Sequence, residues 1–505
     1  FRNIHNLSKA NMDADFRYYT INNGIRLKLY DGYKYLHIQF SKKNEYIPVP
    51  HWYYNIEYLE EMKRGYECRE DLYVPGYFEI PIKKGESIVF TAGLQETPPA
   101  GLKRRFLQEL EKRIPRSCFE NCLINSAQQF VIKKGKVTEI TAGFPWYGRW
   151  SRDTFIALPG LTLAIGDVKT CKSVLDTISA ELKDGLFPNA GKGFHASYNS
   201  ADAPLWYVWA IQQYTGYCGQ VKKVWKEYGP KIKKILTSYR EGTHFNIHLL
   251  ENGLIYAGEP GIPLTWMDAV IGGKPVTQRA GCPVEINALW YNALKFSLEM
   301  ADKTGDARFV NEWKKLPERT ASSFTLSFWD DQGKYLADYT DGEFKDRSVR
   351  PNQIFAVSLD YSPLNEDMKK AVLDKVEQEL LTPKGLRTLS PKNPQYKGVY
   401  EGNQFERDLA CHQGSVWPWL LGHFAEAYLK LHGKSGISFV ENLYLNFEED
   451  MTTHCVGTIP ELYDGDPPHR PNGAISKAWS VAELLRMKKL IEYYKSLKML
   501  ETSFV

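Results

Sequence analysis

Residues 152–158, Arg152-Asp153-Thr154-Phe155-Ile156-Ala157-Leu158, are the stretch that decides the fold of this chain. Small and aromatic residues alternate there with few charges, and a loop rich in Trp and Gly comes just before. Gly414-Ser415-Val416-Trp417-Pro418-Trp419-Leu420 and Ala474-Ile475-Ser476-Lys477-Ala478-Trp479-Ser480-Val481 have the same character. A helix that is apolar on all sides is buried. We therefore predict six buried helices of this kind, which begin near Arg152, Asp202, Val284, Arg350, Gly414 and Ala474.

Charged, one-sided helical patterns separate these buried segments. They lie near residues 117–132, 169–182, 219–240, 306–326, 364–380 and 437–447. One-sided helices face water, so the alternation predicts an inner ring wrapped by an outer ring, an (α/α)6 barrel over 117–505. An open helical solenoid is the competing interpretation. The unequal repeat spacings, about 50 to 82 residues, argue against it.

The first part of the chain has a different pattern. Residues 1–97 contain short alternating runs separated by Gly turns, at 18–21, 27–30, 35–40, 78–82 and 87–91, which predict strands of a partial β-sandwich. Pro98-Pro99-Ala100-Gly101 marks a boundary. We expect a helical linker over 98–116, with one amphipathic helix near 102–114. The predicted class is thus mainly α, with a β-sandwich-like segment before the barrel.

Composition narrows the possible partners. Lys and Arg number 64 and Asp and Glu 60, so the formal charge is 64 − 60 = +4, without a long basic run. Neither nucleic acid nor a membrane is therefore the expected partner. Aromatic residues make up 13% of the 505 residues, which suits a neutral polymer with flat apolar faces, such as a glucan. The eight cysteines have no regular spacing, which favours reduced thiols and a cytoplasmic protein.

Two loop carboxylates are the strongest functional signal. Asp268 ends Leu264-Thr265-Trp266-Met267-Asp268, and Glu461 lies in Thr458-Ile459-Pro460-Glu461-Leu462. Hydrolysis of a glycosidic bond needs one acid for the leaving oxygen and one base for water. A carboxyl group against Trp266 would be desolvated, which raises its pKa toward that of a working general acid. A turn residue and a loop salt bridge are the plainer interpretations of Asp268 and Glu461.

Further candidates lie in the loops that lead into the predicted inner helices, which share one rim of the barrel. An Arg–Asp pair beside aromatic rings can hold a sugar hydroxyl, and Trp rings can form walls. Cys411 next to His412 suggests zinc, but no third ligand is evident, so we expect neither a metal nor a cofactor. The predicted substrate-binding residues are Trp146, Trp150, Arg152, Asp153, Trp266, Arg279, Glu285, His412, Gln413, Trp417 and Trp479.

Five motifs, in order, resemble those of glycogen debranching enzymes of the bacterial and archaeal amylo-α-1,6-glucosidase type. They are Phe144-Pro145-Trp146-Tyr147-Gly148-Arg149-Trp150-Ser151-Arg152-Asp153-Thr154, Thr265-Trp266-Met267-Asp268, Pro283-Val284-Glu285-Ile286-Asn287-Ala288-Leu289-Trp290, His412-Gln413-Gly414-Ser415-Val416-Trp417-Pro418 and Ile459-Pro460-Glu461-Leu462. The resemblance runs from about 115 to 495, and the β-rich start resembles the tail of the family's N-terminal domain.

The resemblance implies an (α/α)6 barrel that hydrolyses α-1,6-glucosidic branches of glycogen or limit dextrin with inversion and without a metal. It implies Asp268 as general acid and Glu461 as general base, with Arg152 and Asp153 on the hydroxyls of the terminal glucose. No (β/α)8 pattern is visible, so only the glucosidase half of the related eukaryotic enzymes is expected. The alternatives are an exo-acting α-1,4-glucosidase of glucoamylase or trehalase type, a non-catalytic glucan-binding protein, and a helical scaffold for protein partners.

Overall fold

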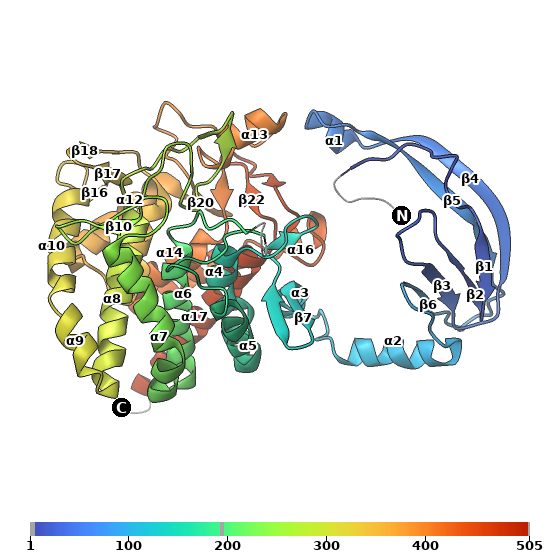
Figure 1. Ribbon diagram of the computed structural model, residues 1–505, viewed down its shortest axis with the longest axis horizontal. Coiled ribbons are helices and arrows are strands. Elements are labelled where there is room, and N and C mark those ends of the chain that lie inside the picture. Colours follow the sequence, from blue (N-terminus) through green and yellow to red (C-terminus); the bar gives the residue numbers. More distant parts are fainter. Residues whose placement is uncertain (1–5, 192–195, 503–505) are drawn as a thin grey trace. The chain divides into compact units, whose positions relative to one another are not determined.

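The computed structural model describes residues 6–191 and 196–502, and within 498–502 it describes the backbone alone. The chain divides into two compact units, residues 1–115 and 116–505. Helices dominate the second unit (Figure 1), so the expectation of a mainly α protein is confirmed. No helix in the described ranges is long and apolar enough to cross a bilayer.

The first unit is built from two antiparallel sheets. One has the order β1-β2-β3-β6, and the other pairs the long strands β4 and β5. Aromatic rings pack between the sheets, with Phe40 against Phe78 at 4.8 Å and Tyr18 against Tyr46 at 4.7 Å between centroids. The elements are β1 (Tyr18–Ile21), β2 (Gly24–Leu27), β3 (Leu36–Phe40), β4 (Glu45–Glu57), α1 (Leu59–Lys63), β5 (Arg69–Glu79), β6 (Phe90–Gly93) and α2 (Leu102–Glu111).

Sequence patterning missed the longest strand of this unit. β4 contains Pro48 and Pro50, which argue against a regular strand because proline lacks a ladder N–H. The structure accommodates them by a register shift between the Pro48 and His51 pairings with β5. The strand expected at 27–30 was also wrong, since β2 lies at 24–27, where Ile25 pairs with Ile38 of β3.

Six buried helical segments of the second unit pack in a closed cyclic order. Each contacts the next along the chain, and the last contacts the first. α6 shows why they lie inside, because positions 203–212 are all buried and leave no polar face. The segments are α4 (Ser151–Leu161), α6 (Ala203–Cys218), α8 (Val284–Thr304), α11 (Phe355–Ser358, preceded by the short 3-10 helix η4, Pro351–Ile354), α14 (Leu420–His432) and α17 (Ala478–Thr502).

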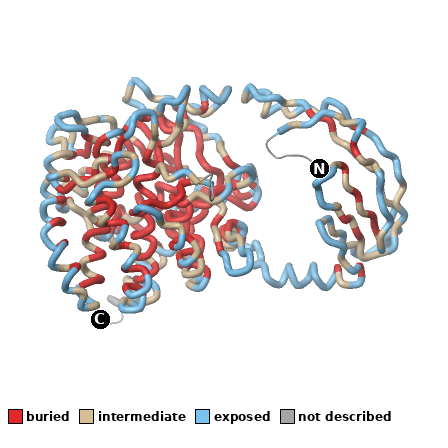
Figure 2. The backbone as a smooth tube through the Cα atoms, in the orientation of Figure 1, coloured by how far each residue is buried: buried red, intermediate tan, exposed pale blue. Residues whose placement is uncertain are grey.

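One-sided helices cover the buried set. Figure 2 shows the buried chain concentrated within the second unit, with exposed turns along its outer helices. Side-chain caps begin several of these helices, as where Asp167 accepts the N–H of Thr170 at 3.0 Å. The helices are α3 (Phe119–Phe130), α5 (Val168–Ser179), α7 (Val221–Glu241), α9 (Ala307–Trp313), α10 (Leu316–Phe328), α12 (Glu366–Leu380) and α15 (Ile437–Leu445).

Short strands line the loops that enter the buried helices. β9 (Gly143–Phe144) pairs with β24 (Ser476–Lys477), and β14 (Cys282–Pro283) pairs with β17 (Tyr339–Asp341), which continues to β18 (Phe344–Lys345). A five-stranded sheet has the order β19-β20-β21-β22-β23. Its strands are β19 (Leu381–Thr382), β20 (Gly385–Arg387), β21 (Val416–Trp417), β22 (Leu462–Tyr463) and β23 (Pro471–Asn472).

The remaining elements of this unit are short hairpins and two small helices. They are β7 (Val131–Lys134), β8 (Val137–Ile140), β10 (His248–Leu249), β11 (Ile255–Tyr256), β12 (Val270–Ile271), β13 (Lys274–Pro275), β15 (Trp329–Asp330), β16 (Tyr335–Leu336), α13 (Gln404–Cys411) and α16 (Asp450–Thr453).

Helix boundaries differ from expectation where a strand intervenes. The segment at Gly414 begins its helix only at Leu420, because Val416 and Trp417 pair with Arg387 and Leu386 of β20. The predicted helix over 306–326 is two helices, α9 and α10. Pro317 stands in the first turn of α10, where its missing N–H is tolerated.

Candidate active site

Asp268 lies at the mouth of a buried aromatic group. Its neighbour Trp266 is 2% exposed, and the Trp266 ring meets His412, Trp417 and Trp419 edge-on at 5.2 to 5.6 Å between centroids. The indole N–H of Trp266 donates to Asn352 Oδ1 at 2.7 Å, which anchors the loop. The Asp268 side chain keeps 33% of its surface exposed. The loop therefore holds a carboxyl group at an apolar wall with one open side.

Arg152 joins Asp268 to a second carboxylate. Its Nη1 donates to Asp268 Oδ2 at 2.9 Å, and its Nε donates to both oxygens of Asp202 at 2.8 Å. Burial raises the pKa of Asp268, and although Arg152 opposes this, the pKa stays above its ordinary value. Asp202, which is fully buried, shares the guanidinium and adds a negative charge nearby. Asp268 is thus the carboxyl group inclined to hold a proton.

Glu461 has different surroundings. Its Oε2 accepts the backbone N–H of Ala474 at 2.9 Å and the hydroxyl of Tyr147 at 3.3 Å. Its Oε1 lies 3.2 Å from Lys477 Nζ. Gly473 makes this approach possible, because a Cβ there would come within 2.6 Å of Glu461 Oε2 and its φ is +70°. The Glu461 carboxylate is therefore held by a backbone N–H, a hydroxyl and an ammonium.

The first turn of α4 connects these two surroundings. Arg152 contacts Asp268, whereas the next residue, Asp153, contacts Lys477 at 3.0 Å, and Lys477 also contacts Glu461. A second connection runs through aromatic rings, from Trp266 to Trp417 and on to Trp479, with 5.6 Å between centroids at each step. Asp268 and Glu461 therefore belong to one cluster. Arg152 and Asp153, expected to act as a pair, have separate partners instead.

Other predicted sugar contacts differ in exposure. Trp146 is 42% exposed and Trp150 is half-buried, on either side of the Tyr147 ring. Trp417 and Trp479 are buried to 4% exposure. Trp146 and Trp150 consequently offer more free ring surface for stacking.

His412 and Gln413 lie deeper in the same group. The His412 ring stacks on Trp417, and burial together with Arg350, Arg152 and Arg279 lowers the pKa of His412 to about 3, so this ring is neutral at physiological pH. Gln413 Oε1 accepts from Arg350 Nη2 at 2.7 Å. The Nδ1 of His412 and the Nε1 of Trp479 are buried without a hydrogen-bond partner in the described ranges.

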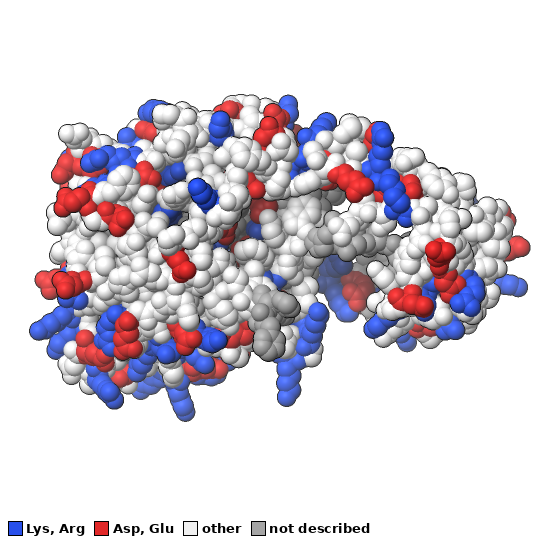
Figure 3. All heavy atoms as spheres, turned by 45° about the horizontal axis from the view of Figure 1, so that its top comes forward, with Lys and Arg blue, Asp and Glu red and all other residues white. Residues whose placement is uncertain are grey.

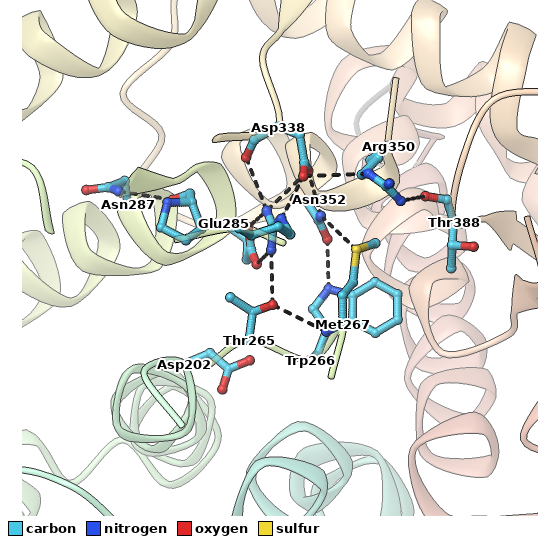
Figure 4. A network of polar contacts seen from close by, with 12 residues as sticks. Asp202, Thr265, Trp266, Met267, Glu285, Asn287, Asp338, Arg350, Asn352 and Thr388 are labelled. Atoms are coloured by element: carbon cyan, nitrogen blue, oxygen red, sulfur yellow. Dashed lines mark hydrogen bonds and ion pairs between the residues drawn. The ribbon is translucent and has the colours of Figure 1, made fainter. Parts of the chain in front are cut away.

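Arg279 and Glu285 require a correction. We expected Glu285 to line the rim, but its side chain is 1% exposed and that of Arg279 is 2% exposed. Both guanidinium edges are taken, with Nη2 donating to Glu285 at 2.5 Å and Nε to Asp338 at 2.6 Å. Figure 4 shows Glu285, Asp338, Asn352 and Trp266 within one network of polar contacts. In this structure the ion pair supports the loop of Asp268 from behind, and Glu285 does not face the rim.

Three residues were absent from the predicted site. Asp202 precedes an inner helix much as Asp153 begins one, and that shared position is a signal that sequence reasoning could have used. Lys477 is a lone cation in an apolar run, which points to a buried anionic partner. Tyr147 lies within the motif at residues 144–154, and its hydroxyl contacts Glu461.

The remaining observations concern possible metal ligands and the charge of the surface. In the described ranges, no group of three or more His, Cys, Asp or Glu side chains is placed to hold a metal ion. Cys411 Sγ and His412 Nε2 lie 3.8 Å apart. On the face in Figure 3, acidic and basic side chains are interspersed.

Two family models match the chain. The model for amylo-alpha-1,6-glucosidase matches residues 125–486, and the model for the glycogen debranching enzyme N terminal matches residues 1–89. The glycogen debranching enzyme of Saccharomyces cerevisiae is 26% identical over 399 residues, which cover 59% of this chain and 26% of the yeast protein. A periplasmic trehalase of Citrobacter koseri is 29% identical over 133 residues, 26% of this chain and 23% of that enzyme. The chain spans about a quarter of the length of these curated relatives.

Two solved structures share the fold. One is an uncharacterized conserved protein from Thermus thermophilus, with a TM-score of 0.54 and 13% identity. The other is a GH63 mannosylglycerate hydrolase from the same organism in complex with glucose, with a TM-score of 0.55 and 12% identity. Each match covers 74% of this chain and 100% of the other. The amylo-alpha-1,6-glucosidase model matches most of this chain, so the chain belongs to the glycogen debranching enzyme family.

Proposed function

We propose that this chain is an inverting glycoside hydrolase that removes α-1,6-linked glucose from glycogen, limit dextrin or branched malto-oligosaccharides. In this proposal the closed set of helices is an (α/α)6 barrel, and the cluster at the start of α4 is its active site. One observation carries the proposal: Arg152 and Asp153, adjacent in sequence, connect Asp268 on one side to Glu461 on the other. Two such carboxyl groups in one aromatic cluster meet the demand of glycoside hydrolysis.

In this mechanism Asp268 is the general acid. It transfers its proton to the glycosidic oxygen as the bond from that oxygen to C1 breaks. Desolvation raises the pKa of Asp268, which favours its protonated form, and Arg152 stabilises the carboxylate that remains after the proton is transferred. The open side of Asp268 is where the leaving sugar would lie.

Glu461 is the general base in the same step. It accepts a proton from a water molecule whose oxygen bonds to C1 on the opposite face of the sugar. Inversion gives β-glucose and requires carboxyl groups about 6.5–9.5 Å apart, which leaves room for that water. Asp153 Oδ2 contacts Lys477 Nζ at 3.0 Å, and in this proposal the Asp153 carboxylate binds a glucose hydroxyl.

Glucose release from limit dextrin tests this function. Wild-type protein should release glucose as the β-anomer, followed by proton NMR before mutarotation. Glu461→Gln and Asp268→Asn should bind the dextrin and release almost none. An initial α-anomer, or full turnover by Glu461→Gln, contradicts the mechanism.

A second candidate rests on the match to a periplasmic trehalase. In this alternative the same acid and base act on a small α-glucoside or on the end of a linear α-1,4 chain. Rates on an isomaltosyl-branched dextrin, a linear dextrin and trehalose separate the two. Dextrin binding without any glucose release would instead favour a glucan-binding protein.

A further inference from the structure

Lys477 is a cation buried where the chain is otherwise apolar. Its side chain is 5% exposed. β24, which carries it, pairs with β9 so that Lys477 lies opposite Gly143. A buried charge is costly unless a partner of opposite sign is present. The position of Lys477 therefore depends on the groups that surround its ammonium.

Two carboxylates and two rings surround the ammonium. Nζ lies 3.0 Å from Asp153 Oδ2 and 3.2 Å from Glu461 Oε1. It also lies 3.9 Å from the centroid of the Tyr147 ring and 4.8 Å from that of Trp479. Burial alone lowers the pKa of Lys477, but the charges of Asp153 and Glu461 outweigh it and hold that pKa above its ordinary value. Lys477 stays charged between these two groups.

The contacts also distinguish the two oxygens of Glu461. Oε2 already accepts from Ala474 N–H and from the Tyr147 hydroxyl, whereas Oε1 contacts Lys477. Around the carboxylate, the other titratable groups are Tyr147, Asp153, Tyr400 and Cys411. None of these four is a cation. Among the described residues, Lys477 is the cationic side chain in contact with Glu461.

We infer that Lys477 is a positioning residue of the proposed hydrolase, which holds Glu461 with Oε1 directed at the attacking water and holds the Asp153 carboxylate beside the glucose that reacts. The inference rests on the proposed function and deepens it. Because Oε2 is held by two neutral donors, Oε1 is the oxygen that receives the proton. Lys477 thus couples the site that binds glucose to the site that activates water.

The pH profile of kcat/KM tests this role with Lys477→Met, which keeps an unbranched side chain one atom shorter and removes the charge. Loss of a nearby cation favours the protonated form of a carboxyl group, so the acidic limb should move to higher pH, by about one unit for a modest change in a charge interaction. The value of kcat should fall at least roughly tenfold. Lys477→Arg should restore the limb toward its wild-type position. An unmoved limb in Lys477→Met overturns the inference.

Lys430→Met is the matched control. Lys430 on α14 also bridges two acidic side chains, Glu426 at 2.9 Å and Asp360 at 3.1 Å, but it has no contact with the site. Its loss should lower the melting temperature and leave the acidic limb in place. If Lys430→Met moved the limb as far as Lys477→Met, the effect would be general destabilisation, and the positioning role would fall.

A second readout needs no activity. Burial already holds the pKa of Asp153 above its ordinary value, and removal of Lys477 raises it further. A carboxyl group whose pKa is raised in the folded state lowers the free energy of unfolding as pH rises through that pKa. The variant, with the higher pKa, is therefore destabilised more than wild type. The gap in Tm between wild type and Lys477→Met should therefore widen with rising pH, and Lys477→Gln serves if the Met variant does not fold. A gap independent of pH contradicts the role, whereas a wild type inactive on every glucan would refute the proposed function separately.

Discussion

The Asp268 side and the Glu461 side of the cluster are built differently around the same first turn of α4. Asp268 meets a guanidinium that Asp202 also holds, and one third of its side chain is open. Glu461 meets an ammonium, a backbone N–H and a hydroxyl, and its side chain is 8% exposed. Each cation also meets a second anion, Asp202 at Arg152 and Asp153 at Lys477, but within the described ranges only Glu461 accepts a backbone N–H and a tyrosine hydroxyl as well.

The difference teaches how one fold can give two carboxyl groups the separate environments that the proposed acid and base roles require. At Asp268, desolvation prevails over the contact with Arg152 and raises the pKa of that carboxyl group. At Glu461, a backbone N–H, a tyrosine hydroxyl and an ammonium converge on the carboxylate. An acid and a base side by side need such a separation of environments.

Loss of either carboxyl group should have the largest effect, and the leaving group should tell the two apart. Asp268→Asn and Glu461→Gln should each lower kcat on limit dextrin by roughly 10² to 10⁴, the usual contribution of acid–base catalysis. Fluoride departs without protonation. Asp268→Asn should therefore hydrolyse α-glucosyl fluoride at a rate near that of wild type, whereas Glu461→Gln should not. Fluoride release measures both, and the reverse pattern would exchange the two roles.

Asp202→Asn should break the sharing of the guanidinium. The substitution removes a carboxylate that pairs with the buried Arg152 guanidinium. Loss of one partner of a buried ion pair costs about 3–5 kcal/mol of unfolding free energy. The negative charge of Asp202 contributes to the raised pKa of Asp268, so its removal lowers that pKa. The alkaline limb of kcat/KM should then move to lower pH, with a lower midpoint in urea. Ser200→Ala removes the hydroxyl's contacts with Arg152 Nη2, Asp202 Oδ1 and Ala203 N–H but no charge, and should leave the limb in place.

Much of the helical architecture follows from sequence, because burial and periodicity are local properties. The outer helices begin within a few residues of the predicted positions, as for α5 at Val168 and α15 at Ile437. Asp268 was a strong candidate because Trp266 predicts a desolvated loop, and this environment is present. The catalytic roles of both carboxyl groups remain predictions.

Partner choice within the cluster was beyond sequence reasoning. Arg152 and Asp153 are adjacent, yet their side chains reach residues 116 and more than 300 positions away. Arg279 was expected to contact substrate but closes on Asp338, 59 positions on. Such pairings depend on which loops tertiary packing brings together, and no local propensity encodes that.

Gly473→Ala should sharpen the comparison on the Glu461 side alone. A side chain there is strained at φ +70° and comes within 2.6 Å of Glu461 Oε2. Gly305→Ala is the control, since its φ is +78° and nothing lies within 4 Å of the added Cβ. Both should lose about 1 kcal/mol of unfolding free energy from backbone strain. Only Gly473→Ala should also lower kcat, and equal kcat values would remove Gly473 from the support of Glu461.

Trp146→Ala should have the smallest effect and should not affect Asp268 and Glu461 differently. Trp146 is exposed and contacts Tyr147 edge-on at 6.4 Å, so its loss removes ring surface without disturbing either carboxyl group. An aromatic contact contributes about 0.5–1.5 kcal/mol, which predicts a rise in KM of roughly two- to tenfold. An interaction made equally in ground and transition states changes KM and leaves kcat unchanged. Steady-state kinetics on branched dextrin decide this, and a fall in kcat with KM constant would instead place Trp146 among the groups that act only in the transition state.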